Sequence, residues 1–473
     1  MGAIIALQYG NVISHRGTES TEIGILLLLT IALYAFALGG GFVYDDEQLL
    51  VETPRLVTAS VKLAFTSDFW GLPAGAWRSL HYRPVAMLAY SGIYRVFGLS
   101  PFAFHAVNIL LHVLATLALF YLVRALCSEV ALAAAALFAV HPLHVETVAW
   151  MSGLTETLVG AAVLGSLALF VHRRYVLSWT LAVIAMLTKE GALILPVLVL
   201  LLPDPEGRAQ GPAPTFPGVG VGPRLRRATP FAMMALAYLI ARAVVLPRPP
   251  QGALLRLLTN GLHDMPGVAA RYVTALFAPW PMAIHYELPG AKTIGAAVVI
   301  AILWFALGRI KGMGAAGALA GLPLLLPVVT SALMVEFVKI QDRYAYISTA
   351  GACLAVALIL RRLPARGLLY ACMLLVPLWA LGTYLQIQVW QDNESLWTHA
   401  LEVTPSSKPA ALNLGYALYT ESRFLEAERV YSLALRYHPE DQELKKMLFL
   451  VEREVNRRKL RPAAGGRRGP PLR

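Results

Sequence analysis

Apolar residues are gathered along this chain into long blocks, which short polar or basic stretches separate. The clearest blocks cover residues 23–38, 104–126, 153–171, 294–307 and 368–385. At 1.5 Å of rise per helical residue, we expect segments of this size to cross the roughly 30 Å hydrocarbon layer of a bilayer. Because backbone groups in lipid have no water to bond, each block is predicted to be an α-helix.

Basic residues follow the ends of these blocks, for example Arg124, Arg173, Arg309 and Arg361. Cytoplasmic loops carry an excess of Lys and Arg, so the pattern predicts about eleven transmembrane helices with the N-terminus in the cytoplasm. The predicted crossings are about 21–40, 104–126, a third segment ending near 141–146, 153–171, 176–187, 192–202, 231–246, 294–308, 315–333, 345–360 and 367–385. Residues 1–385 then form a transmembrane domain, with an exterior loop at 41–100 and a cytoplasmic linker at 203–229.

After residue 386 the hydropathy falls and a repeat of ~34 residues begins, which is the length of a tetratricopeptide repeat (TPR). Three positions recur at this distance: Trp397, Ala400 and Pro405 are matched by Tyr431, Ala434 and Pro439. We therefore predict a TPR module at 386–460. Residues 461–473 are rich in Arg, Gly and Pro and are predicted to be a disordered basic tail.

The composition agrees with a membrane protein, since 57% of the residues are hydrophobic and only 14% are charged. The formal net charge of +12 invites a nucleic-acid function. However, the basic residues lie at the ends of apolar blocks and not on one soluble face, which argues against nucleic-acid binding. The expected class is an all-α, multi-pass membrane protein.

An acidic cluster, Tyr44-Asp45-Asp46-Glu47, follows the first apolar block directly. Like charges held together raise one another's pKa, which suits a general base, a ligand for a divalent metal such as Mg or Mn, or both. The alternative is a solvated loop that caps a helix.

Other charged residues are expected on the same exterior face. Arg83, in His81-Tyr82-Arg83-Pro84, suits a phosphate or a lipid headgroup. His141, His144 and Glu146 resemble a metal site only loosely. Lys189-Glu190 joins two short segments, where charges either build a site or neutralise each other. Asp342-Arg343-Tyr344 precedes the tenth helix. Because these groups come from separate loops to one face, they predict a catalytic site.

Six motifs, in this order, resemble the transmembrane-and-TPR O-mannosyltransferase-like family (TMTC). They are Phe42-Val43-Tyr44-Asp45-Asp46, Tyr82-Arg83-Pro84, Val107-Asn108-Ile109-Leu110-Leu111-His112, His141-Pro142-Leu143-His144-Val145-Glu146, Lys189-Glu190-Gly191 and Asp342-Arg343-Tyr344-Ala345-Tyr346. The resemblance covers essentially the whole chain and implies the GT-C type of membrane glycosyltransferase.

The resemblance also implies a reaction on the non-cytoplasmic face. A sugar, possibly mannose by the family name, would move from a polyprenyl-phosphate donor to a Ser or Thr hydroxyl of an exported protein docked by the TPR module. Asp45 and Asp46 would be the catalytic acids, and Arg83, Lys189 and Arg343 would bind the donor phosphate. Asp45, Asp46 and Glu146 are the candidate metal ligands. Supporting roles fall to His81, His141, Glu146, Glu190, Asp342 and Tyr344.

Two other functions fit parts of the sequence. An O-antigen-ligase-like oligosaccharyltransferase can also end in TPRs, but it places its key basic residues in a large late exterior loop. A membrane-anchored TPR scaffold for envelope assembly would not need Asp45, Asp46, Arg83 and Lys189 on one face. The position of a site outranks likeness of fold in choosing among these functions.

Overall fold

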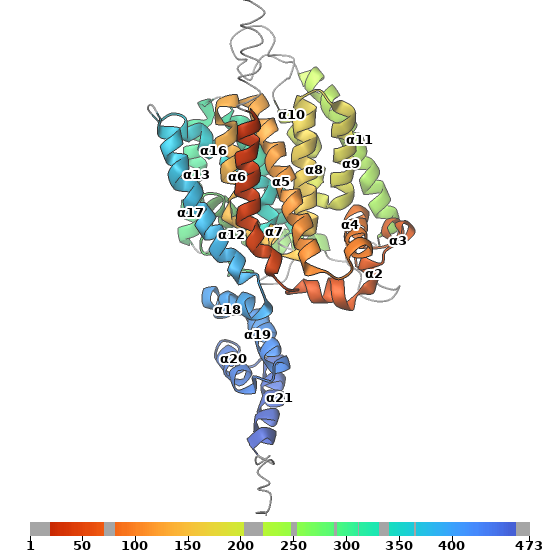
Figure 1. Ribbon diagram of the computed structural model, residues 1–473, viewed down its shortest axis with the longest axis vertical. Helices are drawn as coiled ribbons and strands as arrows, with labels where there is room; N and C mark the ends of the chain where they lie inside the picture. The colour runs from red at the N-terminus through yellow and green to blue at the C-terminus, as the bar shows by residue number, and fades with distance from the viewer. Residues whose placement is uncertain are drawn as a thin grey trace, which may run out of the picture.

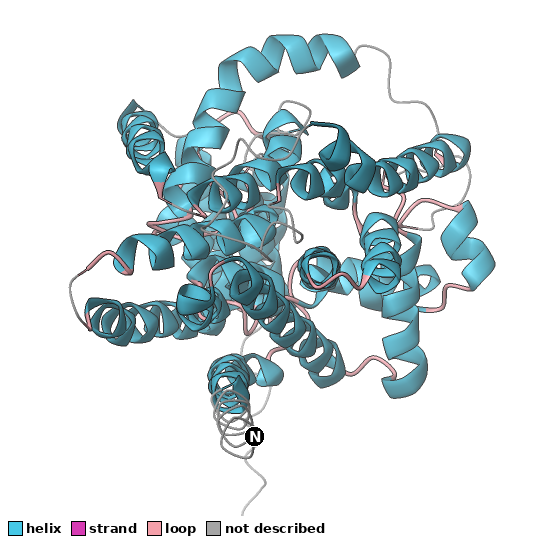
Figure 2. Cartoon of the chain, turned by 90° about the horizontal axis from the view of Figure 1, so that it is seen from above, coloured by secondary structure: helices cyan, strands magenta, loops and turns pink. Residues whose placement is uncertain are grey.

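The computed structural model describes residues 19–70, 81–202, 221–246, 253–287, 291–310, 312–330, 340–363 and 366–459. All regular elements in these ranges are helices, which confirms the predicted all-α class (Figures 1 and 2). The predicted tail at 461–473, residues 203–220 of the predicted linker and residues 71–80 of the predicted exterior loop lie outside the described residues.

Six helices in the described part of the chain are long and apolar enough to span a membrane. They are Glu19–Gly39, Pro101–Leu126 (α5), Met151–Val171 (which contains α8, Leu154–Val171), Gly222–Val245 (within α11, Val221–Val245), Asp342–Leu360 (which contains α16, Tyr346–Leu360) and Gly367–Val389 (α17). A pair bent by 52°, Ser128–Ala139 and Pro142–Val148, raises the number to seven if it is one span. The chain is therefore a multi-pass membrane protein.

Four further predicted crossings are present as shorter apolar helices. They are Tyr175–Thr188 (α9), Glu190–Leu201 (which ends in α10, Leu195–Leu201), Thr293–Ala306 (within α13, Ala291–Ala306) and Met313–Leu324 (which begins with α14, Met313–Gly321). A helix of 10–17 residues is only about 15–26 Å long, which is less than the hydrocarbon thickness. By length and composition, six or seven helices of the described chain are candidate membrane spans, and the count of eleven crossings stays a prediction.

The predicted linker at 203–229 is wrong at its C-terminal end. Helix α11 begins at Val221, about ten residues before the expected start at 231. Pro223 lies in the first turn, where a helix has no need of a backbone N–H donor, so it does not prevent this early start. The basic residues Arg224, Arg226 and Arg227 therefore belong to the helix and not to a loop.

The predicted exterior loop at 41–100 contains helices of its own. A π-helix at Glu47–Glu52 is followed by α2 (Pro54–Val57), α3 (Val61–Thr66) and α4 (Pro84–Phe97). Helix α4 buries one side, because Met87 and Tyr90 are buried while Val96 and Phe97 at its C-terminal end are exposed. Pro84 supplies its first residue, a position that needs no N–H donor.

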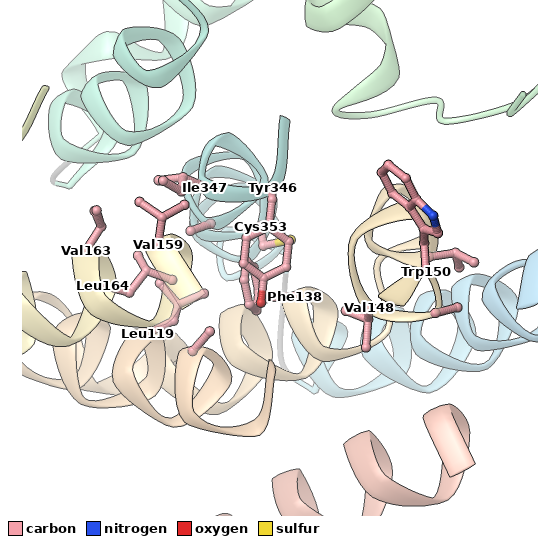
Figure 3. Packing of buried hydrophobic residues seen from close by; sticks show 14 of the residues in the cluster. Leu119, Phe138, Val148, Trp150, Val159, Val163, Leu164, Tyr346, Ile347 and Cys353 are labelled. Carbon is pink, nitrogen blue, oxygen red and sulfur yellow. The ribbon is translucent and has the colours of Figure 1, made fainter. Parts of the chain in front are cut away.

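Close helix packing brings the charged segments together at one end of the bundle. Figure 3 shows Leu119, Phe138 and Val159 around Tyr346, the first residue of α16. A Cβ added at Gly160 would lie 2.3 Å from the Tyr346 ring. Gly160 therefore lets α8 and α16 approach closely, as small residues do between membrane helices.

Four helices extend from the bundle at the C-terminal end: α18 (Asn393–Val403), α19 (Lys408–Thr420), α20 (Phe424–Tyr437) and α21 (Gln442–Lys459) (Figure 1). Consecutive helices pack through small residues. Ala427 is fully buried, and a Cβ added at Gly415 would lie 2.3 Å from the Tyr431 ring. Helix α17 continues to Val389, so the predicted domain boundary at 386 falls within the preceding helix.

Candidate functional site

Three ion pairs join charged residues from distant segments. The Arg83 guanidinium donates to Glu190 Oε2 through Nε (3.1 Å) and Nη2 (3.0 Å). Lys189 Nζ donates to Glu156 Oε1, and Arg343 Nη1 donates to Glu146 Oε1. The Arg343 backbone N–H also donates to Glu146 Oε2 at 3.1 Å. Burial of an unpaired charge in a membrane protein costs free energy. Each of these three cations therefore forms an ion pair with a carboxylate.

The three pairs form one cluster, which Tyr344 helps to connect. Its ring lies 4.6 Å from Lys189 Nζ and 5.2 Å from Arg343 Cζ. Arg83 is close enough to act electrostatically on Lys189, as are Arg343 and the carboxylates Glu146 and Glu190. His81 lies at the edge, with Nδ1 3.4 Å from Glu190 Oε1. The structure thus brings together all three predicted phosphate-binding cations. We name this set the cation cluster: Arg83, Lys189, Arg343 and their partners Glu190, Glu156 and Glu146.

Asp45 adjoins the cation cluster. Burial raises the pKa of its carboxyl to about 6, and the positive charge of Arg343 partly offsets that effect. Among the described residues, none donates a hydrogen bond to this carboxylate. A carboxyl group with a pKa near neutrality and free oxygen atoms can accept a proton from a substrate.

Asp46 is bound very differently from its neighbour. Its side chain is fully buried. Oδ1 accepts from the Ser152 backbone N–H at 2.8 Å and from Ser152 Oγ at 2.5 Å, while Oδ2 accepts from the Val43 N–H at 3.1 Å. Burial raises its pKa to about 7, against the effect of these hydrogen bonds. Asp46 therefore fastens the first loop to the segment that precedes α8.

Asp342 faces a separate polar group. Its Oδ2 accepts from Tyr286 OH at 2.6 Å, and its Oδ1 lies 3.8 Å from Arg271 Nη2. The Arg271 guanidinium also lies over the Tyr286 ring, 4.4 Å from its centre. Asp342 and Glu146 line one small cavity, together with Pro142, Leu143, Met282, Ala283, Gln386 and Trp390.

His141 does not reach the cation cluster. Its Nδ1 accepts from the Leu143 N–H at 3.3 Å, so Nε2 carries the proton and donates to the Leu276 carbonyl at 3.2 Å. His144 is likewise buried and lies 2.6 Å from Thr349 Oγ1. Both imidazoles hydrogen-bond to other segments of the chain, and among the residues that the structure describes they are not part of a group that could hold a metal ion.

The proposed metal ligands do not fit a shared ion. Among the described residues, no three or more His, Cys, Asp or Glu side chains are grouped so that they could hold one. The oxygens of Asp46 are occupied by Ser152 and Val43, and those of Glu146 by Arg343. Asp45, Asp46 and Glu146 are therefore unsuited to hold one metal ion together.

Several residues of the site were not predicted from the sequence. Glu156 was missed although a lone acid inside an apolar block is a strong signal of function. Trp150 was also missed; its ring stacks on Tyr44 (5.7 Å between centres) and lies 4.9 Å from Arg343 Cζ. Asn393 gave no local signal, because its partners lie at Tyr44 and Glu47.

A polar, charge-paired site at one end of a bundle of membrane-spanning helices defines the protein as a multi-pass membrane protein with a buried ionic centre. The chain is homologous to the TMTC protein O-mannosyltransferases, as the resemblance predicted. It is 28% identical to a protein O-mannosyl-transferase of Caenorhabditis elegans over 88% of this chain and 62% of the relative. It is 26% identical to protein O-mannosyl-transferase TMTC1 of Homo sapiens over 90% of this chain and 56% of the relative.

A Drosophila melanogaster protein O-mannosyl-transferase, Tmtc1, is 33% identical over a shorter region, which is 47% of this chain and 28% of the relative. The chain thus spans less than two thirds of the length of these relatives. No protein-family model matches the chain. No solved structure matches it either.

Proposed function

We propose that the protein is a membrane glycosyltransferase that moves a sugar, with mannose as the first candidate, from a polyprenyl-phosphate donor to a Ser or Thr hydroxyl of an exported protein. The observation that carries the proposal is Asp45, a carboxyl with a raised pKa, beside the cation cluster, whose Arg83, Lys189 and Arg343 side chains are each 12% exposed. The printed activity of the homologues, protein O-mannosyl transfer, supports the same reaction class.

In the proposed reaction, Asp45 and the cation cluster have separate roles. Asp45 accepts the proton of the acceptor hydroxyl. At the same time, the oxygen of that hydroxyl forms a bond to the anomeric carbon of the sugar. The bond between that carbon and the phosphate oxygen breaks, and the polyprenyl phosphate leaves with the electron pair. Arg83, Lys189 and Arg343 stabilise the charge on the leaving phosphate, as fixed cations do in phosphoryl chemistry.

The carboxylate partners fix the orientation of the cations in the cation cluster. Glu190 holds the Arg83 guanidinium through two donors to one oxygen, and Glu146 holds both the side chain and the backbone of Arg343. Side chains held in this way lose little further entropy when a phosphate arrives, which favours donor binding.

We further propose that the four shorter apolar helices cross the membrane with the longer spans, which gives the eleven-crossing GT-C arrangement, and that α18–α21 form a TPR module. The shift of ~34 residues between Trp397 and Tyr431 supports the second proposal. Both residues are buried at the contacts of successive helices. In this proposal the module presents the acceptor protein to the site.

We propose that the site and the module lie on the non-cytoplasmic side. The loop after Gly39 and helix α18 are in contact at one end of the bundle. Arg124 lies at the opposite end, paired with Glu22 at the start of the first helix. Such a basic end faces the cytoplasm in most membrane proteins.

Single cysteines placed in a cysteine-free background will test this orientation. An impermeant maleimide added to intact cells is expected to label Glu52→Cys and Ser422→Cys, while Gly222→Cys reacts only after permeabilisation. Labelling of Gly222→Cys in intact cells, or protection of Ser422→Cys there, would reverse the proposed topology.

The transferase proposal itself predicts a defined product. Purified protein in lipid vesicles is expected to move labelled mannose from polyprenyl-phosphate mannose to Ser- or Thr-containing peptides, and cells lacking the protein are expected to export proteins without that hexose. Identical hexose content in cells with and without the protein, together with no transfer in vesicles from any polyprenyl-phosphate sugar, would refute the function.

A further inference from the structure

The amide side chain of Asn393, the first residue of α18, contacts the acidic loop on both sides of Asp45. Its Oδ1 accepts a hydrogen bond from the Tyr44 backbone N–H at 2.9 Å. Its Nδ2 donates to Glu47 Oε1 at 3.0 Å. One side chain of the C-terminal helices thus spans the segment that carries the candidate base.

The loop needs such support because its backbone is strained. Tyr44 has φ of 55°, in the left-handed region that is unfavourable for a residue with a side chain. Strained backbone persists only where surrounding contacts hold it in place. Here the Tyr44 ring is held between Trp150 (5.7 Å) and Trp397 of α18 (5.2 Å).

Helix α18 is itself anchored to the membrane bundle by contacts that do not involve the acidic residues. The Gly41 N–H donates to the Gln391 carbonyl at 2.9 Å, and His399 Nε2 donates to the Met282 carbonyl at 2.8 Å. Thr404 Oγ1 donates to the His285 carbonyl at 3.0 Å. The helix therefore presents Asn393 to the loop from a fixed position.

We infer that Asn393 is a positioning residue for sugar transfer, which couples the C-terminal helices to the orientation of Asp45. The inference rests on the proposed transferase function. It assigns these helices a role in catalysis as well as in acceptor docking, because loss of the amide frees the Tyr44 backbone and lets the Asp45 carboxylate leave its place beside Arg343.

The test uses the full chain and two readouts. In Asn393→Ala, hydrogen–deuterium exchange of the peptide that contains Tyr44 is expected to accelerate. The kcat of transfer is expected to fall by about 10- to 100-fold, the effect of small misplacements of reacting groups, with little change in KM for the donor. Ser406→Ala serves as the matched control, since Ser406 binds Glu287 (2.5 Å) and does not touch the loop; it should leave both readouts unchanged.

A rescue variant separates positioning from general stability. Asn393→Asp alone sets two carboxylates against each other, and kcat should fall as in Asn393→Ala. Asn393→Asp combined with Glu47→Gln keeps the bond from the Tyr44 N–H and rebuilds the bond to residue 47 with donor and acceptor exchanged, so kcat should return to within a few-fold of the parental value.

The outcomes are distinguishable. Faster exchange with parental kcat in Asn393→Ala, or no rescue by the double variant, would overturn the positioning role. Absence of transfer by the parental protein would instead remove the proposed function, and with it this role, while the exchange result would still report whether the contact exists.

Discussion

Replacement of Asp45 by asparagine is expected to lower the rate of sugar transfer by about 10²- to 10⁴-fold, the usual contribution of a general base. The amide is nearly isosteric but cannot accept the acceptor proton. Because none of the described residues donates a hydrogen bond to the Asp45 carboxylate, folding and membrane insertion should be unchanged. Transfer in vesicles, measured against the amount of inserted protein, checks the prediction.

The pH dependence gives a second measure of the same residue. With a pKa of about 6, Asp45 is protonated below that pH and cannot act as a base, so transfer should fall as pH decreases through about 6 and level off above about 7. The Asp45→Asn variant should lose this dependence. If the variant transfers sugar at the parental rate, Asp45 is not the general base of the reaction.

Asp46→Asn is the informative comparison. An amide NH₂ in place of one oxygen would face the N–H of either Val43 or Ser152, donor against donor. We expect this to destabilise the loop by about 1–3 kcal/mol, the cost of an unsatisfied buried group. The variant should therefore lose expressed protein as well as activity. The sequence could not separate these two neighbouring aspartates, whereas their hydrogen bonds do.

The second large effect concerns the buried pair of Lys189 and Glu156. Lys189→Met or Glu156→Met alone should lower the free energy of unfolding by about 3–5 kcal/mol, because each leaves an unpaired buried charge. The double variant should recover most of this stability, since two apolar side chains replace the pair. It should nevertheless transfer little sugar, because the donor phosphate has lost a cation.

Thermal unfolding in detergent, alongside transfer in vesicles, measures both effects. Lys408→Met is a matched control, since Lys408 pairs with Asp441 at 2.7 Å in the partly exposed C-terminal helices. An exposed pair contributes about 0–1 kcal/mol, so this change should be nearly neutral. Parental stability of both single variants, or parental transfer by the double variant, would contradict the role given to Lys189.

The ion-pair partners of Lys189 and Glu190 could not be predicted from the neighbouring sequence. As neighbours of opposite charge, they invited the interpretation that they neutralise each other. The backbone at Lys189 is extended, with φ of −161° and ψ of 146°, and successive side chains of an extended segment point in opposite directions. Lys189 therefore reaches Glu156 on α8, while Glu190 reaches Arg83 before α4.

The sequence by itself determined the helical membrane class, the positions of the apolar helices, the basic end of the bundle and the gathering of Asp45, Arg83, Lys189 and Arg343 on one face. These properties follow from hydropathy and charge, which are local and additive along the chain. Only the tertiary structure decided which carboxylate pairs with which cation. It also decided that Asn393 meets a loop 349 residues away, because such contacts depend on how helices pack and not on the residues beside them.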